Sequence, residues 1–129
     1  MKSTATVMIV DDDPDIREVM TIFLEADGYR VTVAGDGLDA LEQLRSGSRP
    51  AVILLDLMMP RLDGEQFLKQ FRAGRFGDIP VVILSGHSAA EKMAKELKAA
   101  SCLLKPVGAD ELLNAVRRFA LPCPKNDVA

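Results

Sequence analysis

Acidic side chains gather where apolar runs of this sequence end. Asp11, Asp12 and Asp13 directly follow the run Thr6–Val10, and Asp56 directly follows another apolar run. Carboxylates that lie close together resist joint ionisation, and a hard divalent cation commonly relieves their repulsion. Mg²⁺ prefers oxygen ligands and is typically bound by one or two carboxylates together with phosphate oxygens. These residue types therefore indicate metal-assisted phosphate chemistry, on condition that the fold brings the acids together.

Two further polar side chains follow apolar runs in the same way. Ser85 comes directly after Val81–Leu84, and Lys105 comes directly after Ser101–Leu104. A hydroxyl can donate a hydrogen bond and an ammonium group carries a compact positive charge, so both can contact phosphoryl oxygens. A serine that begins a turn or a surface lysine would be ordinary on its own. Their positions beside the acidic residues favour a functional interpretation.

The elements that must position these side chains follow from the apolar periodicity. Short apolar runs alternate with longer segments of helical period, which predicts βαβ units and one parallel sheet with helices on both faces. In such a sheet ligands bind beyond the carboxyl ends of the strands. We expect strands at 6–10, 30–34, 52–55, 81–84 and 101–104, and helices at 14–27, around 38–46, around 67–71, at 89–97 and at 109–119.

Helix ends and apolar faces can also be predicted. Asp13 before Pro14 indicates the N-cap of the first helix, and Gly28 indicates its end. The segment 89–97 carries only a thin apolar stripe, so we expect this helix to be loosely held. The apolar stripe of the first helix is expected at Ile16, Val19, Met20, Phe23 and Leu24, and that of the second at Leu38, Leu41 and Leu44.

Taken in order, these residues resemble the receiver domain of bacterial response regulators. Each motif is weak alone, but five of them at successive strand ends make a specific pattern over residues 6–120. The motifs are Val10-Asp11-Asp12, Asp56 within Leu55-Asp56-Leu57-Met58-Met59-Pro60, Asp63-Gly64, Leu84-Ser85-Gly86 and Leu104-Lys105-Pro106.

The resemblance implies a particular fold. It is the flavodoxin-like (CheY-like) α/β fold, a doubly wound (βα)5 domain whose five-stranded parallel sheet has the order 2-1-3-4-5, for which the chemotaxis protein CheY is the type example. The receiver domain would occupy residues 1–121, and residues 122–129 would form a short tail or the start of a linker.

In that order the first and third strands are neighbours, so Asp11, Asp12 and Asp56 should crowd together. The resemblance implies that Mg²⁺ is the cofactor. It also implies that Asp12 and Asp56 bind the ion directly, that Asp11 acts through a water molecule, and that the backbone carbonyl of Met58 is a further ligand.

By the same resemblance, Asp56 would be the phosphoacceptor and form an aspartyl phosphate. Lys105 and Ser85 would contact the phosphoryl oxygens. Met58 and His87 would border the phosphoryl group and tune its hydrolysis.

Cys102 departs from the family pattern, which usually has an aromatic residue at this position of the fifth strand. The aromatic residue normally moves with the hydroxyl when the domain is phosphorylated, so its replacement puts the output change in question. We expect this change in the face formed by the last two helices and the fifth strand.

The resemblance also implies the partners of the domain. The expected phosphoryl donor is a phosphohistidine on a sensor histidine kinase or phosphotransfer protein, because a carboxylate needs an activated phosphoryl group. We further expect a downstream protein target, no enzymatic activity beyond self-phosphorylation and self-dephosphorylation, and a monomer or a weak phosphorylation-dependent dimer.

Three other functions share parts of the pattern. A pseudo-receiver would bind partners without phosphorylation, and only Cys102 favours it. A magnesium-dependent phosphohydrolase of the haloacid dehalogenase type needs an acid two residues after the nucleophile, where this chain has Met58. A flavodoxin-like cofactor carrier needs a Ser/Thr/Gly-rich phosphate loop after the first strand, where this chain has three acids that would repel phosphate.

Composition limits the class of protein. A chain of 129 residues with 48% hydrophobic and 27% charged residues predicts one domain with a real core. Its net charge of −3 weighs against nucleic-acid binding. The longest apolar run, 51–55, is far short of the roughly 20 residues that span a bilayer. Two cysteines, Cys102 and Cys123, make no disulfide framework, so a cytoplasmic protein is expected.

Overall fold

A computed structural model describes residues 5–56, 64–74, 76, 79–85, 101–104 and 108–120. The helix expected at 89–97 and the tail at 122–129 lie outside these ranges. None of the helices described here has the length and apolar character needed to cross a membrane. The elements are β1 (Thr6–Val10), α1 (Pro14–Ala26), β2 (Arg30–Ala34), α2 (Gly37–Arg45), β3 (Val52–Asp56), α3 (Gly64–Ala73), β4 (Val81–Ser85), β5 (Ser101–Leu104) and α5 (Ala109–Ala120).

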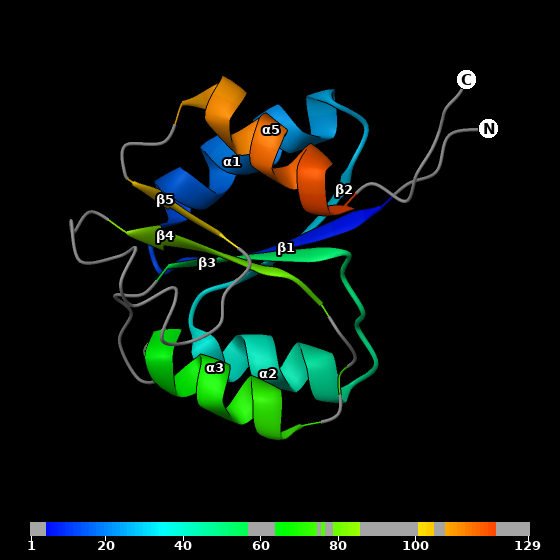
Figure 1. Ribbon diagram of the computed structural model, residues 1–129, viewed down its shortest axis with the longest axis vertical. Helices are drawn as coiled ribbons and strands as arrows, with labels where there is room; N and C mark the ends of the chain where they lie inside the picture. Colours follow the sequence, from blue (N-terminus) through cyan, green and yellow to red (C-terminus); the bar gives the residue numbers. More distant parts are fainter. Residues whose placement is uncertain are drawn as a thin grey trace.

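The five strands form one parallel sheet in the order β2-β1-β3-β4-β5. Helices α1 and α5 cover one face of this sheet, and α2 and α3 cover the other (Figure 1). The predicted strand order and the doubly wound α/β fold are therefore confirmed. All five strands lie where the sequence predicts them, although β3 and β4 each continue for one more residue and so include Asp56 and Ser85.

The central strands are apolar on both sides because both faces of the sheet are covered. Every residue of β3 is buried. Alternate residues point to opposite faces of a strand. Ile53 and Leu55 therefore pack into the cluster beneath α2 and α3, whereas Val52 and Leu54 pack into the cluster beneath α1 and α5. This two-sided burial holds the carboxyl end of β3 firmly in the middle of the sheet.

Helix α1 begins and ends as the sequence predicts. The Asp13 carboxylate accepts hydrogen bonds from the backbone N–H groups of Asp15 (2.9 Å) and Ile16 (3.4 Å), which is the expected N-cap. At the other end Gly28 has a φ of 96°, a left-handed conformation that glycine adopts without a steric cost.

Two residues assigned to buried helical faces are exposed, so these assignments were wrong. Val19 of α1 is 48% exposed, because the helix turns Met20 and Leu24 toward the sheet and leaves Val19 at the edge of the contact. Leu38 of α2 is 38% exposed, because the buried face of this helix is formed by Gly37, Ala40, Leu41 and Leu44. In each helix the apolar stripe predicted from spacing is wider than the face that the sheet covers.

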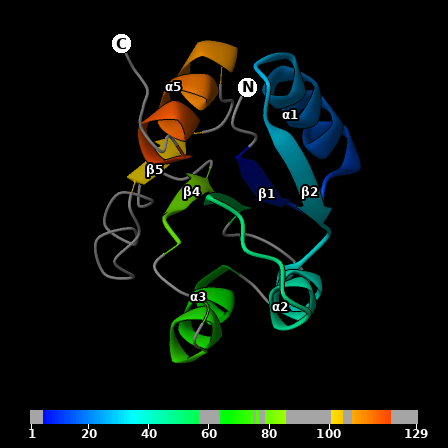
Figure 2. The same ribbon diagram turned by 90° about the vertical axis from the view of Figure 1, so that its right-hand side faces the viewer.

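Helix α5 lies beside α1 on the same face of the sheet (Figure 2). The Arg117 guanidinium donates two hydrogen bonds to the carboxylate of Asp27, at 3.0 and 3.1 Å, just beyond the end of α1. These bonds raise the pKa of Arg117 above its usual value. Burial raises the pKa of the neighbouring Tyr29, and the charge of Asp27 raises it further. The Arg117–Asp27 ion pair joins α5 to the turn between α1 and β2.

Candidate functional site

Three carboxylates meet at the carboxyl ends of β1 and β3. Oxygen atoms from Asp11, Asp12 and Asp56 all lie within 4.8 Å of one another. The register pairs Val10 with Leu55, so the residues that follow them stand side by side. Asp11 is 0% exposed and Asp56 is 5% exposed, whereas Asp12 is exposed. The predicted convergence of the three acids is thus present in the fold.

Hydrogen bonds to the backbone and to the carboxylate of Asp11 hold this residue in place. Its backbone N–H donates to the carbonyl of Ala34 at the end of β2 (3.1 Å), and its carboxylate accepts a bond from the backbone N–H of Asp13 (2.9 Å). Its own carbonyl accepts a bond of 2.7 Å from the side chain of Arg17. One carboxylate oxygen of Asp11 therefore closes a local turn, a bond that the sequence interpretation did not anticipate.

The donor set suits a hard divalent cation. Carboxylate oxygens are the ligands that Mg²⁺ prefers, and a typical site uses one or two of them with water and phosphate oxygens completing the shell. Burying like charges this close is unfavourable unless a positive charge offsets it. Because Asp12 is exposed, the cluster is accessible from solvent on one side. Asp11, Asp12 and Asp56 can therefore hold a metal ion.

Ser85 and Cys102 lie in the strands beyond β3. Asp56 pairs with Leu84, so Ser85 is one residue farther along the neighbouring strand, and Ser85 itself pairs with Leu104 of β5. Cys102 pairs with Ile83, is partly buried and packs against the core cluster beneath α2 and α3. The sheet thus brings the backbone of Ser85 to the same edge as the acids.

Met58, His87 and Lys105 lie outside the described residues. Their predicted roles as a metal ligand, a neighbour of the phosphoryl group and a phosphoryl-binding cation stay predictions.

Sequence reasoning missed Arg17. Its guanidinium contacts Asp11 at the carboxyl edge of the sheet, although the residue belongs to α1 rather than to a strand end. The available signal is its position one helical turn after Asp13. Long helical side chains point back toward the N-terminus, which directs this one to the loop after β1.

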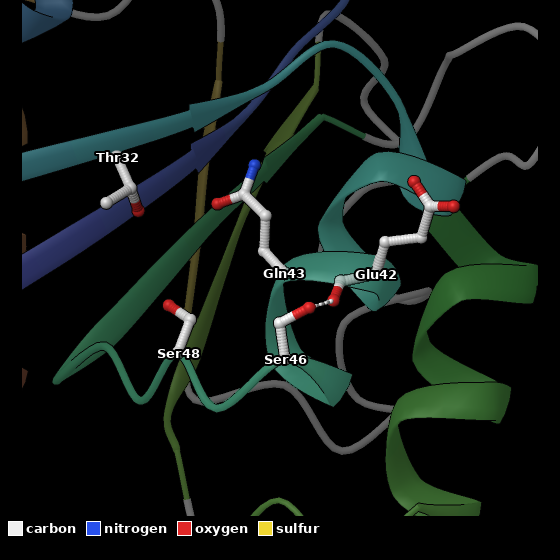
Figure 3. Close-up of a pocket in the computed structure, with 5 residues that line it drawn as sticks. All are labelled: Thr32, Glu42, Gln43, Ser46 and Ser48. Atoms are coloured by element: carbon white, nitrogen blue, oxygen red, sulfur yellow. Dashed lines mark hydrogen bonds between the residues drawn. The ribbon is translucent and has the colours of Figure 1, made fainter.

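A separate pocket lies between β2 and α2 (Figure 3). Its lining includes Thr32 in the middle of β2 and Ser46, which follows the last residue of α2. Helix α2 runs back from the carboxyl edge of the sheet, so the lining residues Ser46 and Ser48 lie toward the opposite edge from the acids. Among the described residues, the Thr32 hydroxyl is the buried side-chain polar atom without a hydrogen-bond partner. The pocket is not part of the acidic site.

Comparisons with known proteins agree with this geometry. The family model of the response regulator receiver domain matches residues 7–117. The response regulator MprA of Mycobacterium tuberculosis is 35% identical over 125 residues, which cover 95% of this chain and 54% of that protein. The chain therefore spans about half the length of the curated relatives it matches.

Solved structures of response regulators and receiver domains share the fold of this chain. A putative response regulator from Chloroflexus aurantiacus superposes with a TM-score of 0.85 at 29% identity, covering 92% of this chain and 98% of that one. The receiver domain of a sensor histidine kinase from Pseudomonas aeruginosa has a TM-score of 0.81 at 27% identity, covering 92% and 98% of the two chains. Its crystal structure has a magnesium ion coordinated in the active site cleft.

Magnesium is expected to stabilise the folded protein through the acidic cluster. A ligand that binds only the folded state at ten times its Kd adds about 1.4 kcal/mol. For a domain of this size, that corresponds to a rise of roughly 4–6 °C in Tm. Asp12→Asn should lose most of this rise in a thermal melt with and without Mg²⁺. Asp15→Asn removes an equal charge from the exposed first turn of α1 and should keep it. An equal rise in both variants would place the ion elsewhere.

Proposed function

The chain belongs to the response regulator receiver domain family, and from this premise we propose that Asp56 accepts a phosphoryl group from a phosphohistidine. A receiver domain is a signalling domain of two-component systems rather than a catalyst. The proposal rests on one observation, the meeting of Asp56 with Asp11 and Asp12 at the carboxyl edge of the sheet. The donor would be a sensor histidine kinase or a phosphotransfer protein, and the domain would act in the cytoplasm.

The transfer itself is a displacement at phosphorus. A carboxylate oxygen of Asp56 attacks the phosphorus atom in line with the P–N bond of the donor, and the electron pair of that bond returns to the imidazole. Bound Mg²⁺ would supply positive charge to the phosphoryl oxygens. Asp11, Asp12, Asp56 and the carbonyl of Met58 would hold it. The magnesium ion in the receiver domain from Pseudomonas aeruginosa supports this assignment.

Lys105 and Ser85 would contact the phosphoryl oxygens. The ammonium of Lys105 would neutralise charge as the phosphoryl group approaches, and the hydroxyl of Ser85 would donate a hydrogen bond to the product. The sheet register supports the role of Ser85, because it follows the residue that pairs with Asp56. Lys105 directly follows the last residue of β5, the strand that pairs with β4.

Acetyl phosphate with Mg²⁺ is expected to add one phosphate to the protein, detected by intact mass spectrometry. Asp56→Asn should abolish the adduct, because an amide cannot displace acetate from phosphorus. Chelation of the metal by EDTA should do the same. Lys105→Met should slow adduct formation, and Ser85→Ala should shorten the lifetime of the adduct.

Asp15→Asn serves as the control, since it lies near the site but outside the cluster, and it should react like the wild type. A wild-type protein that forms no adduct would favour a pseudo-receiver that binds partners without phosphorylation. An adduct that persists in Asp56→Asn would place the phosphoacceptor elsewhere.

Met58 and His87 would set the lifetime of the aspartyl phosphate. Both would border the phosphoryl group, where a side chain can shield phosphorus from water or orient a water molecule toward it. We expect the double variant Met58→Ala/His87→Ala to change the dephosphorylation rate severalfold while the adduct still forms. The rate would be followed by the decay of the phosphorylated mass after donor removal. An unchanged rate would contradict the assignment.

Phosphorylation would be communicated to the face formed by residues 89–97, β5 and α5. This face would bind the downstream target or a second copy, giving a monomer or a weak phosphorylation-dependent dimer. Cys102 replaces the usual aromatic residue of β5, so the movement would depend on a smaller side chain. Together 1–121 would form the receiver unit, and 122–129 a short tail or the start of a linker.

Hydrogen exchange should detect this change. Beryllofluoride, which mimics the phosphoryl group on an aspartate, is expected to slow amide exchange in peptides from 86–104 because the segment becomes more tightly held. Peptides from α2, on the opposite face of the sheet, provide the internal control. Equal exchange over 86–104 with and without the mimic would contradict the proposed output face.

A further inference from the structure

We propose that Arg17 is a positioning residue of the acidic cluster. In this inference its guanidinium fixes the peptide between Asp11 and Asp12, and thereby places the Asp12 carboxylate beside the other two acids. The inference rests on the proposed function in one respect, namely that the cluster binds a divalent cation.

The contact that carries the inference is short and charge-assisted. Nη1 of Arg17 donates to the carbonyl oxygen of Asp11 at 2.7 Å in a partly buried environment. Hydrogen bonds from charged donors are shorter and about twice as strong as neutral ones. The same nitrogen lies 3.6 Å from the position that a Cβ would take at Gly35, so the guanidinium also packs against the turn after β2. Arg17 therefore ties α1 to the carboxyl ends of β1 and β2.

A single carbonyl can set the position of Asp12 because peptide units are rigid. The carbonyl of Asp11 and the N–H of Asp12 belong to the same plane, with little freedom of rotation between them. The N–H of Asp11 is fixed by Ala34, and its carboxylate is fixed by the N–H of Asp13. Arg17 secures the backbone carbonyl of Asp11 and with it the peptide plane that leads into Asp12.

Asp12 is the acid that most needs such support. Asp11 and Asp56 are buried at the ends of central strands, whereas Asp12 is exposed. Packing therefore restrains Asp12 less than it restrains the other two. A metal site depends on groups that orient its ligands, and loss of such a group typically costs 10–100-fold in affinity.

The location of Arg17 is electrostatically unusual for a helix. It occupies the first turn of α1, whose N-terminus carries partial positive charge and favours acids over cations. The hydrogen bond to the Asp11 carbonyl offsets this disadvantage. A side chain that served only as an exposed surface charge would not make the hydrogen bond to the Asp11 carbonyl.

A charge effect and a positioning effect of Arg17 predict opposite changes in the affinity for Mg²⁺. Arg17 is a cation near a cation site, so a purely electrostatic effect predicts that its removal tightens Mg²⁺ binding. A positioning effect predicts that its removal weakens Mg²⁺ binding. The sign of the change therefore decides between the two.

The test measures the Kd for Mg²⁺ by isothermal titration calorimetry at constant ionic strength. Arg17→Met keeps most of the apolar stem but removes the charge and the donors, and it should raise the Kd about tenfold. Arg17→Lys keeps the charge, but its side chain is shorter and lacks the planar guanidinium whose Nη1 contacts both the Asp11 carbonyl and the Gly35 turn. It should raise the Kd about threefold. Arg45→Met, an equal loss of charge from an exposed residue in the last turn of α2, should stay within about twofold of the wild type, because screening weakens distant charges.

The outcomes separate the inference from the proposed function. A wild-type protein that binds no Mg²⁺ overturns the proposed function itself. Wild-type binding with an equal or lower Kd in Arg17→Met overturns only the role of Arg17. A lower Tm with an unchanged Kd means that Arg17 serves stability alone and also overturns it. If Arg17→Met does not fold, Arg17→Lys decides by the same criterion.

Discussion

Three carboxylates with oxygens within 4.8 Å of one another repel, and the rest of the domain must hold them together against that repulsion. Two of them cannot move away, because Asp11 and Asp56 are buried at the ends of adjacent central strands. The strands are in turn fixed by apolar packing on both faces. The sheet therefore preserves a concentration of negative charge that attracts a divalent cation, and in the proposed function the bound cation offsets the repulsion between the acids and an incoming phosphoryl group.

The parallel sheet explains why these residues meet although they are far apart in the sequence. Each crossover returns the chain to the same edge, so the carboxyl ends of β1, β3, β4 and β5 form one row. Function then depends on the residue that happens to end each strand. The fold supplies the row, and the acids give it the negative charge on which the proposed metal-assisted phosphoryl transfer depends.

Much of this arrangement was predictable because the relevant signals are local. Apolar runs located every strand, and Asp13 with Pro14 located the start of α1. The strand order came from a family resemblance, since the periodicity of single elements does not determine their neighbours. The exposure of Val19 and Leu38 was missed, because it depends on how far the sheet extends beneath each helix. Arg17 was missed for a related reason. Its position one helical turn after Asp13 directs the side chain toward the loop after β1, but the backbone carbonyl that it contacts depends on the folded geometry of that loop.

Arg17 lies where the helix dipole disfavours a cation, but its contact with Asp11 favours it there. A cation in the first turn of a helix opposes the helix dipole by several tenths of a kcal/mol up to about 1 kcal/mol. Such a cost persists only where the surroundings offset it, and here Asp11 supplies a carbonyl and the cluster supplies negative charge. The N-terminus of α1, with its own acidic cap at Asp13, thus lies within the field of the acids that follow β1. The start of α1, the end of β1 and the acidic cluster are therefore coupled electrostatically. A change of charge in any one of them should alter the interactions of the other two.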